Sequence, residues 1–156
     1  MRVYFAGSIK GGRTFAGGYL RIVEEIEKQG HSVLGAHTAS SNPTAREPAP
    51  HLVYRRDMRW LLSANAVVAE VSQPSLGVGY EIGTAVQRGI PVLCLCRADQ
   101  GLERVSFMIS GNTAPLLRLR VYDAGSLSRT IRTFCRWACG ARISGEKPSP
   151  VRRRLR

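Results

Sequence analysis

Short apolar runs rich in β-branched residues recur along the chain and are separated by turn-forming residues. Runs of this length predict strands of a parallel sheet, which are buried on both faces and therefore read as nearly continuous hydrophobic segments. The predicted strands are residues 2–6, 31–36, 66–69, 90–96 and 119–122.

Between these runs, apolar residues recur every three or four positions, which predicts amphipathic helices. In residues 15–29 they mark one face, and Gly30 follows as a stop signal. Further helices are predicted over residues 52–63, 80–88 and 126–138, with a short one inside residues 100–112. The candidate core positions of the 52–63 helix are Leu52, Val53, Met58, Leu61 and Leu62.

The order of these elements defines the fold class. Residues 2–36 contain a strand, a helix and a second strand. Such a βαβ unit joins parallel strands through a right-handed crossover. Strands and helices go on alternating to the end of the pattern. We therefore predict an α/β fold with a five-stranded parallel doubly wound sheet of flavodoxin-like or Rossmann-like type, in strand order 2-1-3-4-5.

The segment that joins the third strand to the next helix, residues 72–83, carries candidate chemistry. In an open α/β sheet the ligand binds beyond the carboxyl ends of the strands, where this loop would lie. Gly77 and Gly79 let the backbone approach a ligand, and free N–H groups at a helix start attract anions. Glu81 is expected in the first helical turn, facing the ligand. The alternative is that Glu81 is only an acid favoured there by the helix dipole.

A second glycine-rich turn follows the first strand, at residues 7–13. Ser8, Lys10 and Arg13 bring a hydroxyl and two cations within reach of a phosphate. The turn fits neither the Gly-x-Gly-x-x-Gly nor the Walker pattern, which argues against nucleotide cofactors of those kinds. A turn that merely needs glycine is equally consistent with the sequence.

Asp57 is the candidate for a second carboxylate. It lies among Arg55, Arg56 and Arg59, so an ionised surface acid paired with a neighbouring arginine is the alternative reading. Residues 38–50 form a long polar loop of the kind that often covers a site. The histidines at its two ends, His37 and His51, either contact a ligand or are surface residues without a role.

Composition narrows the class of protein. A chain of 156 residues with 44% hydrophobic residues is the size of a single domain with a proper core. No apolar run approaches the ~20 residues of a membrane span, and we expect an intracellular protein. Cys94 and Cys96 alternate in a predicted strand, and Cys135 and Cys139 lie four apart on a predicted helix. We read them as small apolar residues and expect neither a metal nor a disulfide.

The formal charge of +12 raises nucleic acid or an anionic substrate as a partner. Residues 141–156 hold six basic residues against Glu146, together with Pro148 and Pro150, and show no apolar period. We expect one folded domain over residues 1–140 and a basic, disordered tail over residues 141–156. The tail is either a solvated end or a nuclear-localisation or nucleic-acid patch.

Three parts of the chain together resemble a known enzyme family. They are residues 4–13, Asp57 with Trp60 and Leu61, and the segment 67–83, which ends in Ser-Gln-Pro-Ser-Leu-Gly-Val-Gly-Tyr-Glu-Ile-Gly. These residues resemble the 2'-deoxynucleoside 5'-phosphate N-hydrolase (Rcl) family of the nucleoside 2-deoxyribosyltransferase superfamily. The resemblance extends from about Val3 to Tyr122 and leaves out the basic tail.

This resemblance implies a homodimeric enzyme that cleaves the N-glycosidic bond of a nucleoside 5'-monophosphate. Glu81 would be the nucleophile, Asp57 would help to protonate the departing base, and Tyr4 would lie beside Glu81. Two carboxylates in these roles are what a retaining glycosidic cleavage needs. Ser106 would reach the site of the neighbouring subunit. The substrate-binding residues implied are Gly7, Ser8, Ile9, Lys10, Gly11, Ser75, Gly77, Gly79, Ser106 and Met108.

The same resemblance implies no cofactor and no metal. Ser75 separates the two activities of the superfamily, because transferases that act on free nucleosides usually have an aspartate there, which would repel a phosphate. The family commonly has arginine where this chain has Lys10, which leaves the base preference open. Related enzymes accept deoxyribonucleotides or ribonucleotides, so the sugar is open as well.

Two other functions stay possible from the sequence: base exchange between deoxynucleosides, and a non-enzymatic module that binds nucleotides or nucleic acid. The body of the chain lacks the basic and aromatic stripe of a stacking surface, so we expect nucleic acid only at the tail. No membrane partner is expected. The expected location is the cytoplasm, with the nucleus as a further possibility.

Overall fold

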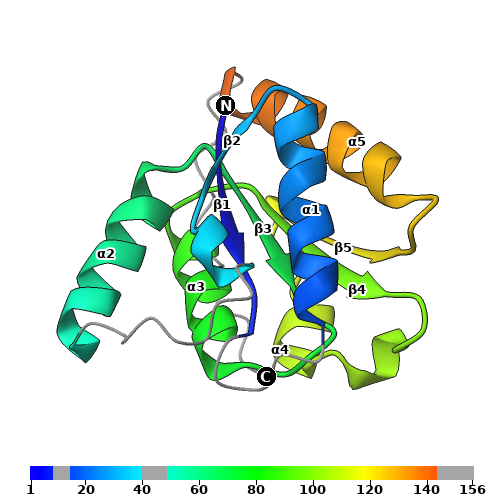
Figure 1. Ribbon diagram of the computed structural model, residues 1–156, viewed down its shortest axis with the longest axis horizontal. Coiled ribbons are helices and arrows are strands. Elements are labelled where there is room, and N and C mark those ends of the chain that lie inside the picture. Colours follow the sequence, from blue (N-terminus) through cyan, green and yellow to red (C-terminus); the bar gives the residue numbers. More distant parts are fainter. Residues whose placement is uncertain (9–14, 40–48, 144–156) are drawn as a thin grey trace, which may run out of the picture.

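The computed structural model describes residues 1–8, 15–39 and 49–143 (Figure 1). Five parallel strands form one sheet in the order β2-β1-β3-β4-β5. The strand order predicted from the sequence is therefore confirmed. The strands are β1 (Arg2–Ala6), β2 (Ser32–Leu34), β3 (Ala66–Glu70), β4 (Val92–Arg97) and β5 (Leu117–Tyr122).

Helices cover both faces of this sheet. In Figure 1, α1 and α5 lie together on one side, and α2 and α3 lie together on the other. The α-helices are α1 (Ala16–Lys28), α2 (Pro50–Ser63), α3 (Leu76–Gln87), α4 (Phe107–Ser110) and α5 (Leu127–Ile143). Short 3-10 turns occupy Ala36–Thr38 and Leu102–Arg104. None of the helices in the described part of the chain has the length and apolar character needed to cross a membrane.

The alternation of side chains along each strand divides the core into two layers. Val3 and Phe5 of β1 point toward α1 and α5, whereas Tyr4 and Ala6 point toward α2 and α3. The first layer also holds Ile22, Leu93, Ile131 and Phe134, and the second holds Leu61, Val67, Ile82 and Cys94. Each fully buried aliphatic side chain stabilises the fold by about 1.5–3 kcal/mol. Burial on both faces explains the continuous apolar runs of the sequence.

The packing of α2 differs from the prediction. Leu61 is fully buried, but Leu52 is 47% exposed and Leu62 is 48% exposed, so these two candidate core positions do not face the sheet. Successive residues of a helix are rotated by about 100°, and Leu62 therefore cannot share the direction of Leu61. Leu52 lies in the first turn of α2, outside both core layers.

Helix α3 begins four residues earlier than the predicted start at Tyr80. Ser75 is its N-cap, and the Ser75 hydroxyl oxygen accepts a hydrogen bond from the Val78 N–H at 3.4 Å. Gly77 and Gly79 are thus in the first turn of the helix, and Glu81 is in the second turn. The expectation of Glu81 in the first turn was wrong, because the serine cap outweighs the poor helix propensity of the two glycines.

A buried acid at the end of β3 fixes the loop that leads to α3. Glu70 is fully buried, and its carboxylate accepts hydrogen bonds from the Ser72 hydroxyl, from the Ser72 N–H at 3.3 Å and from the Tyr122 hydroxyl at 3.4 Å. The Arg97 N–H donates to the Ser72 hydroxyl oxygen at 2.8 Å. Burial raises the pKa of Glu70, and the hydrogen bonds from Ser72 and Tyr122 offset only part of this rise. The loop after β3 is therefore tied to β4 and β5.

The end of the last helix can be compared with the expected domain boundary. Helix α5 continues to Ile143, three residues past the expected domain boundary at residue 140. The rest of the expected tail, residues 144–156, lies outside the described residues, as do most of the polar loop (residues 40–48) and residues 9–14.

Candidate active site

The candidate site lies where the chain leaves β1 and β3. These strands are neighbours, with Tyr4 opposite Val67 and Ala6 opposite Ala69. From β1 the chain goes to α1 on one face of the sheet, and from β3 it goes to α3 on the other. Such a change of direction leaves an open position at the carboxyl ends of the two strands, where ligands bind in doubly wound folds.

Tyr4 and Glu81 meet at this position. The Tyr4 hydroxyl donates a hydrogen bond of 2.6 Å to Oε1 of Glu81 and so orients the carboxyl group. Loss of hydration on burial raises the pKa of Glu81 to about 7; the Tyr4 hydrogen bond lowers it and the charge of Asp57 raises it. Burial and the charge of Glu81 also raise the pKa of Tyr4, so its hydroxyl remains a donor.

Asp57 reaches the same site from α2. Its charge raises the pKa of both Glu81 and Tyr4, so the predicted second carboxylate lies within electrostatic range of the first. The Arg56 Nε–H donates to Oδ1 of Asp57 at 2.8 Å, and the Asp57 side chain is 20% exposed. Within the described residues no hydrogen bond is formed to Oδ2 of Asp57. The carboxylate is thus paired with a neighbouring arginine and also acts electrostatically on the candidate nucleophile.

A group of side chains beside Asp57 was missed in the sequence. Nη2 of Arg56 lies 2.8 Å from Nε2 of His37, and the Arg56 guanidinium is 5.0 Å from the centre of the Trp60 ring. The His37 and Trp60 rings are 5.3 Å apart. The sequence signal for this group was that Arg56 is adjacent to Asp57 and that Trp60 follows one helical turn later, on the same side of α2 as Arg56. His37 therefore contacts α2 although its side chain is exposed, and His51 is exposed as well.

The N-terminus of α3 presents an open surface. A Cβ atom added at Gly77 would meet only the Ser75 hydroxyl, at 3.9 Å, and one added at Gly79 would meet nothing within 4 Å. Packing among the described residues therefore does not require either glycine, and within that part of the chain both leave the helix end open. Gly7 differs, because its Cβ would lie 3.1 Å from the Tyr19 ring. Close packing accounts for Gly7.

Ser8 is the other polar residue at the carboxyl ends of the strands. It is 1% exposed, and its hydroxyl finds no hydrogen-bond partner among the described residues. A buried hydroxyl without a partner costs about 1–3 kcal/mol, so such a group is a candidate for binding a polar ligand atom. The predicted binding residues Ile9, Lys10 and Gly11 follow directly but lie outside the described residues.

Two further predicted binding residues, Ser106 and Met108, lie on α4. Ser106 is the N-cap of this helix, and its hydroxyl oxygen accepts a hydrogen bond from the Met108 N–H at 3.3 Å. The Met108 side chain is 83% exposed and the adjacent Phe107 side chain is 87% exposed. In the described part of this chain, neither Ser106 nor Met108 forms a hydrogen bond to the Tyr4–Glu81 pair.

None of the four cysteines forms a disulfide. Cys94 and Cys96 are both buried on the same face of β4, as their alternation predicted. Burial raises the pKa of the Cys94 thiol to about 12, so this thiol is not ionised near neutral pH. Across residues 1–8, 15–39 and 49–143, no group of three or more His, Cys, Asp or Glu side chains is arranged to hold a metal ion.

The fold is that of a doubly wound α/β protein, and its candidate site holds the hydrogen-bonded Tyr4–Glu81 pair within electrostatic range of Asp57. Residues 3–127 match the family model described as nucleoside 2-deoxyribosyltransferase, and the chain belongs to that family. The resemblance inferred from the sequence is therefore confirmed.

Individual relatives agree with this membership. The chain is 46% identical over 125 residues to a 5-hydroxymethyl-dUMP N-hydrolase of Mus musculus, covering 78% of this chain and 70% of the relative. It is 39% identical over 124 residues to a putative 2'-deoxynucleoside 5'-phosphate N-hydrolase 1 of Methanococcoides burtonii, covering 78% of this chain and 99% of the relative. The structure of a CMP N-glycosidase of Clostridium botulinum has the same fold, with a TM-score of 0.61, 18% identity and coverage of 88% of this chain and 99% of that one.

The geometry predicts how Glu81 responds to changes in its two neighbours. In Tyr4→Phe the pKa of Glu81 should rise above about 7, because the hydrogen bond that stabilises the carboxylate is lost. In Asp57→Asn it should fall, because a like charge is removed. A pH titration of the carboxyl carbon signal by NMR, assigned with Glu81→Gln, measures both shifts.

Tyr54→Phe is the matched control for Tyr4→Phe. Tyr54 pairs with Tyr80 at 3.3 Å between their hydroxyls, and this change should leave the Glu81 titration in place. A wild-type titration near the ordinary 4.5 would contradict the burial of Glu81.

Proposed function

We propose that this chain is a hydrolase that cleaves the N-glycosidic bond of nucleoside or 2'-deoxynucleoside 5'-monophosphates, releasing the base and the sugar 5-phosphate. The observation that carries the proposal is the hydrogen-bonded Tyr4–Glu81 pair within the electrostatic reach of Asp57. The printed names of the relatives in mouse and Methanococcoides burtonii support the reaction and the phosphorylated substrate.

In the first step Glu81 attacks C1' of the sugar. Tyr4 holds Oε1, which leaves Oε2 as the attacking oxygen. A C–O bond to Glu81 forms as the C1'–N bond breaks, and the base leaves with a proton supplied through Asp57. A pKa of about 7 means that a substantial fraction of Glu81 is a carboxylate at neutral pH, without the strong hydration of an exposed acid.

In the second step water attacks C1' of the glycosyl ester. Asp57 is again the group that moves the proton, now from the water, and the C–O bond to Glu81 breaks. The products are the sugar 5-phosphate and free Glu81. No metal or organic cofactor enters either step, because two carboxylates perform the nucleophilic and proton-transfer roles.

We assign the 5'-phosphate to Ser8 and to the N-terminus of α3. The buried Ser8 hydroxyl would donate to a phosphate oxygen, and the open backbone at Gly77 would donate its N–H. Ser75 both caps α3 and offers a neutral side chain beside the phosphate. These groups bind an anion without adding a fixed positive or negative charge next to the nucleophile.

Base exchange is the second candidate function, because the family model is named for a transferase. The two reactions share the glycosyl ester and differ in what opens it, water or a second base. Ser75 favours the monophosphate hydrolase, since an aspartate at this position would face the phosphate. A non-enzymatic nucleotide-binding module is the third candidate; it would bind monophosphates without releasing base.

The substrate class can be read from a panel of nucleoside and deoxynucleoside 5'-monophosphates and the matching free nucleosides, with free base measured by chromatography. Base should be released from monophosphates alone. Glu81→Ala should reduce this release by about a thousandfold or more, because the nucleophile is lost. Release from free nucleosides would overturn the role of the phosphate, unchanged release by Glu81→Ala would overturn the role of Glu81, and a silent panel would favour the binding module.

The charge at residue 75 provides a separate test. Ser75→Asp keeps a good N-cap for α3 but places a negative charge beside the phosphate. We expect kcat/KM for a monophosphate to fall about a hundredfold, equivalent to ~2.7 kcal/mol. Steady-state kinetics with the best monophosphate of the panel measures the change.

Ser75→Asn is the matched control, because asparagine caps equally well and adds no charge. It should retain most of the activity. An equal loss in both variants would show that shape rather than charge matters at this position.

We further propose a homodimer in which α4 of one subunit completes the site of the other. The support is a set of exposed apolar side chains on the side of the sheet that carries α2 and α3. Unusually large apolar patches mark interfaces. The side chains are Tyr54 (55%), Leu76 (97%), Tyr80 (55%), Phe107 (87%) and Met108 (83%). Ser106 directly precedes Phe107 and Met108, and we propose that its hydroxyl reaches the phosphate in the site of the partner subunit.

Mixing two inactive variants tests the shared site. Glu81→Ala lacks the nucleophile, and Ser106→Asp is expected to repel the phosphate from the partner site. In a random mixture of equal amounts, half of the dimers are mixed and each has one native site, so about one quarter of the wild-type activity should return. Activity is measured after the subunits have exchanged.

Two unmixed samples are the controls, and light scattering records their oligomeric state. If the dimers exchange subunits but no activity returns, the proposal that Ser106 contributes to the partner site is contradicted. A monomeric wild-type chain that is fully active would contradict the dimer itself.

We place the enzyme in the cytoplasm, where its nucleotide substrates are found. The basic residues after α5, among them Arg152, Arg153 and Arg154, support the nucleus as a second location.

A further inference from the structure

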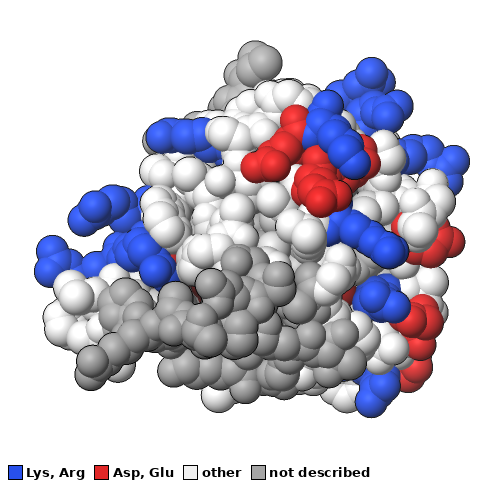
Figure 2. Space-filling model, in the orientation of Figure 1, with Lys and Arg blue, Asp and Glu red and all other residues white. Residues whose placement is uncertain are grey.

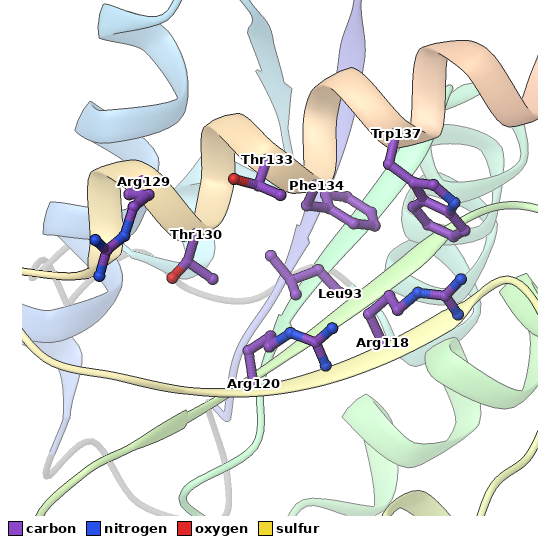
Figure 3. Close-up of a pocket in the computed structure, with 8 residues that line it drawn as sticks. All are labelled: Leu93, Arg118, Arg120, Arg129, Thr130, Thr133, Phe134 and Trp137. Carbon is purple, nitrogen blue, oxygen red and sulfur yellow. The ribbon is translucent and has the colours of Figure 1, made fainter.

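A groove lies between α5 and the edge strand β5, on the face of the sheet that carries α1 (Figure 3). It has a volume of about 390 Å³. Residues of α5 line one side, the arginines of β5 line the other, and Leu93 of β4 lies between them. The lining residues are Leu93, Arg118, Arg120, Arg129, Thr130, Thr133, Phe134 and Trp137.

Three cations and no carboxylate line this groove. The neighbouring acidic residues Glu24, Glu25 and Glu27 belong to α1, and Figure 2 shows acidic side chains over α1 beside basic ones over α5. A concentration of one sign of charge without counter-charges raises the local concentration of anions. The lining of the groove is therefore electropositive.

Two of the arginines are held in place by the backbone. Nη1 of Arg118 donates to the carbonyl oxygens of Pro115 at 2.8 Å and Leu117 at 3.0 Å, and Nη1 of Arg120 donates to that of Leu119 at 2.8 Å. A guanidinium has five N–H donors, so other donors of each group remain for a ligand. Fixing the arginines beforehand lowers the entropy cost of binding.

The floor of the groove is apolar and partly aromatic. Leu93 is 1% exposed and Phe134 is 4% exposed, and the guanidinium of Arg118 lies 4.2 Å from the centre of the Trp137 ring. The Phe134 and Trp137 rings are 5.7 Å apart. Indole rings and guanidinium planes are surfaces on which nucleobases stack. A bare inorganic anion would use the arginines but not this floor.

Protection of an edge strand is the simpler explanation for arginines on β5. Charged residues on an edge oppose pairing with another sheet, and a second copy of β5 would bring arginine against arginine. This explanation covers Arg118 and Arg120. It does not account for Arg129, which comes from α5, or for the aromatic floor.

We propose that this groove is a second nucleotide site, in which Arg120 and Arg129 bind the phosphate and the base stacks against the Arg118–Trp137 pair. Its volume is within the range of small-ligand pockets. It lies on the opposite face of the sheet from Tyr4 and Glu81. Both sites can therefore be occupied at the same time.

The two tryptophans of the chain make the sites separately observable. Trp137 lies in the groove, and Trp60 lies beside Arg56 and His37 near the candidate active site. Their indole N–H signals in a ¹⁵N-labelled full-length chain, assigned with Trp137→Phe and Trp60→Phe, report on one site each. The titrant is pseudouridine 5'-monophosphate, whose base is joined by a C–C bond and is not released by hydrolysis.

The Trp137 signal should shift and saturate. In Arg120→Glu/Arg129→Glu the midpoint of this shift should move to a concentration at least about tenfold higher, while any response of Trp60 is kept. Arg88→Glu, an exposed arginine at the end of α3, is the control and should change neither signal. An unmoved Trp137 signal, or one with the same midpoint in the double variant, would overturn the site.

Three further titrations identify the source of the nucleotide. Saturation by the mononucleotide at a lower concentration than by a single-stranded oligonucleotide supports a free nucleotide, and the reverse order supports a nucleic-acid strand. Inorganic phosphate that saturates the Trp137 shift at the same concentration as the mononucleotide would show that the base is not recognised and would overturn the proposal. None of these outcomes depends on the N-hydrolase activity.

Discussion

The pairing of β1 with β3 is the constraint on which the site depends. Because β1 continues into α1 on one face of the sheet and β3 continues into α3 on the other, these two helices leave the carboxyl ends of the strands uncovered. The same pairing places Tyr4 on the side of α3, where its hydroxyl reaches Glu81 at 2.6 Å. A shift of one residue along β1 would turn Tyr4 to the opposite face and separate the pair. The topology and the chemistry are therefore fixed by the same strand pair.

Stability and function oppose one another at the start of α3. Two glycines in the first turn weaken a helix, and alanine at either position would meet no close contact in the described structure. The cap from Ser75 and the anchored loop at Glu70 and Ser72 offset this weakness. Burial of Glu81 is a second cost of the same kind, because an acid with a pKa of about 7 is less favourably ionised in the folded chain than in water. Such local costs are typical of a site that binds an anion close to a poorly hydrated nucleophile.

Much of the fold could be predicted from the sequence, because buried parallel strands leave uninterrupted apolar runs and the βαβ unit restricts the topology. Glu81 and Asp57 could be named as candidate carboxylates and Tyr4 from the family resemblance; in the structure Tyr4 is hydrogen-bonded to Glu81, and Asp57 lies within electrostatic range of both. Their surroundings could not be predicted. The start of α3 depends on a single hydrogen bond from Val78 to Ser75, and the position of His37 depends on Arg56 and Trp60, which approach it from another element. Periodicity reports which side of an element is buried, but not which polar groups meet across it.

Part of the positive charge of the chain is concentrated on β5 and α5, which the amino-acid composition does not reveal. Much of the formal charge of +12 lies in the tail, yet five arginines outside residues 141–156 are carried by β5 and α5: Arg118, Arg120, Arg129, Arg132 and Arg136. On β5, residues 118 and 120 point to the same side because strand side chains alternate, and α5 adds Arg129 across the groove. Neither element contains an acid to neutralise them. Ser8 and the start of α3, the described groups assigned to the 5'-phosphate, are neutral and are not among the residues that line the groove, so they do not explain these arginines. An anionic ligand in the α5 groove would explain Arg129 as well as the two arginines of β5.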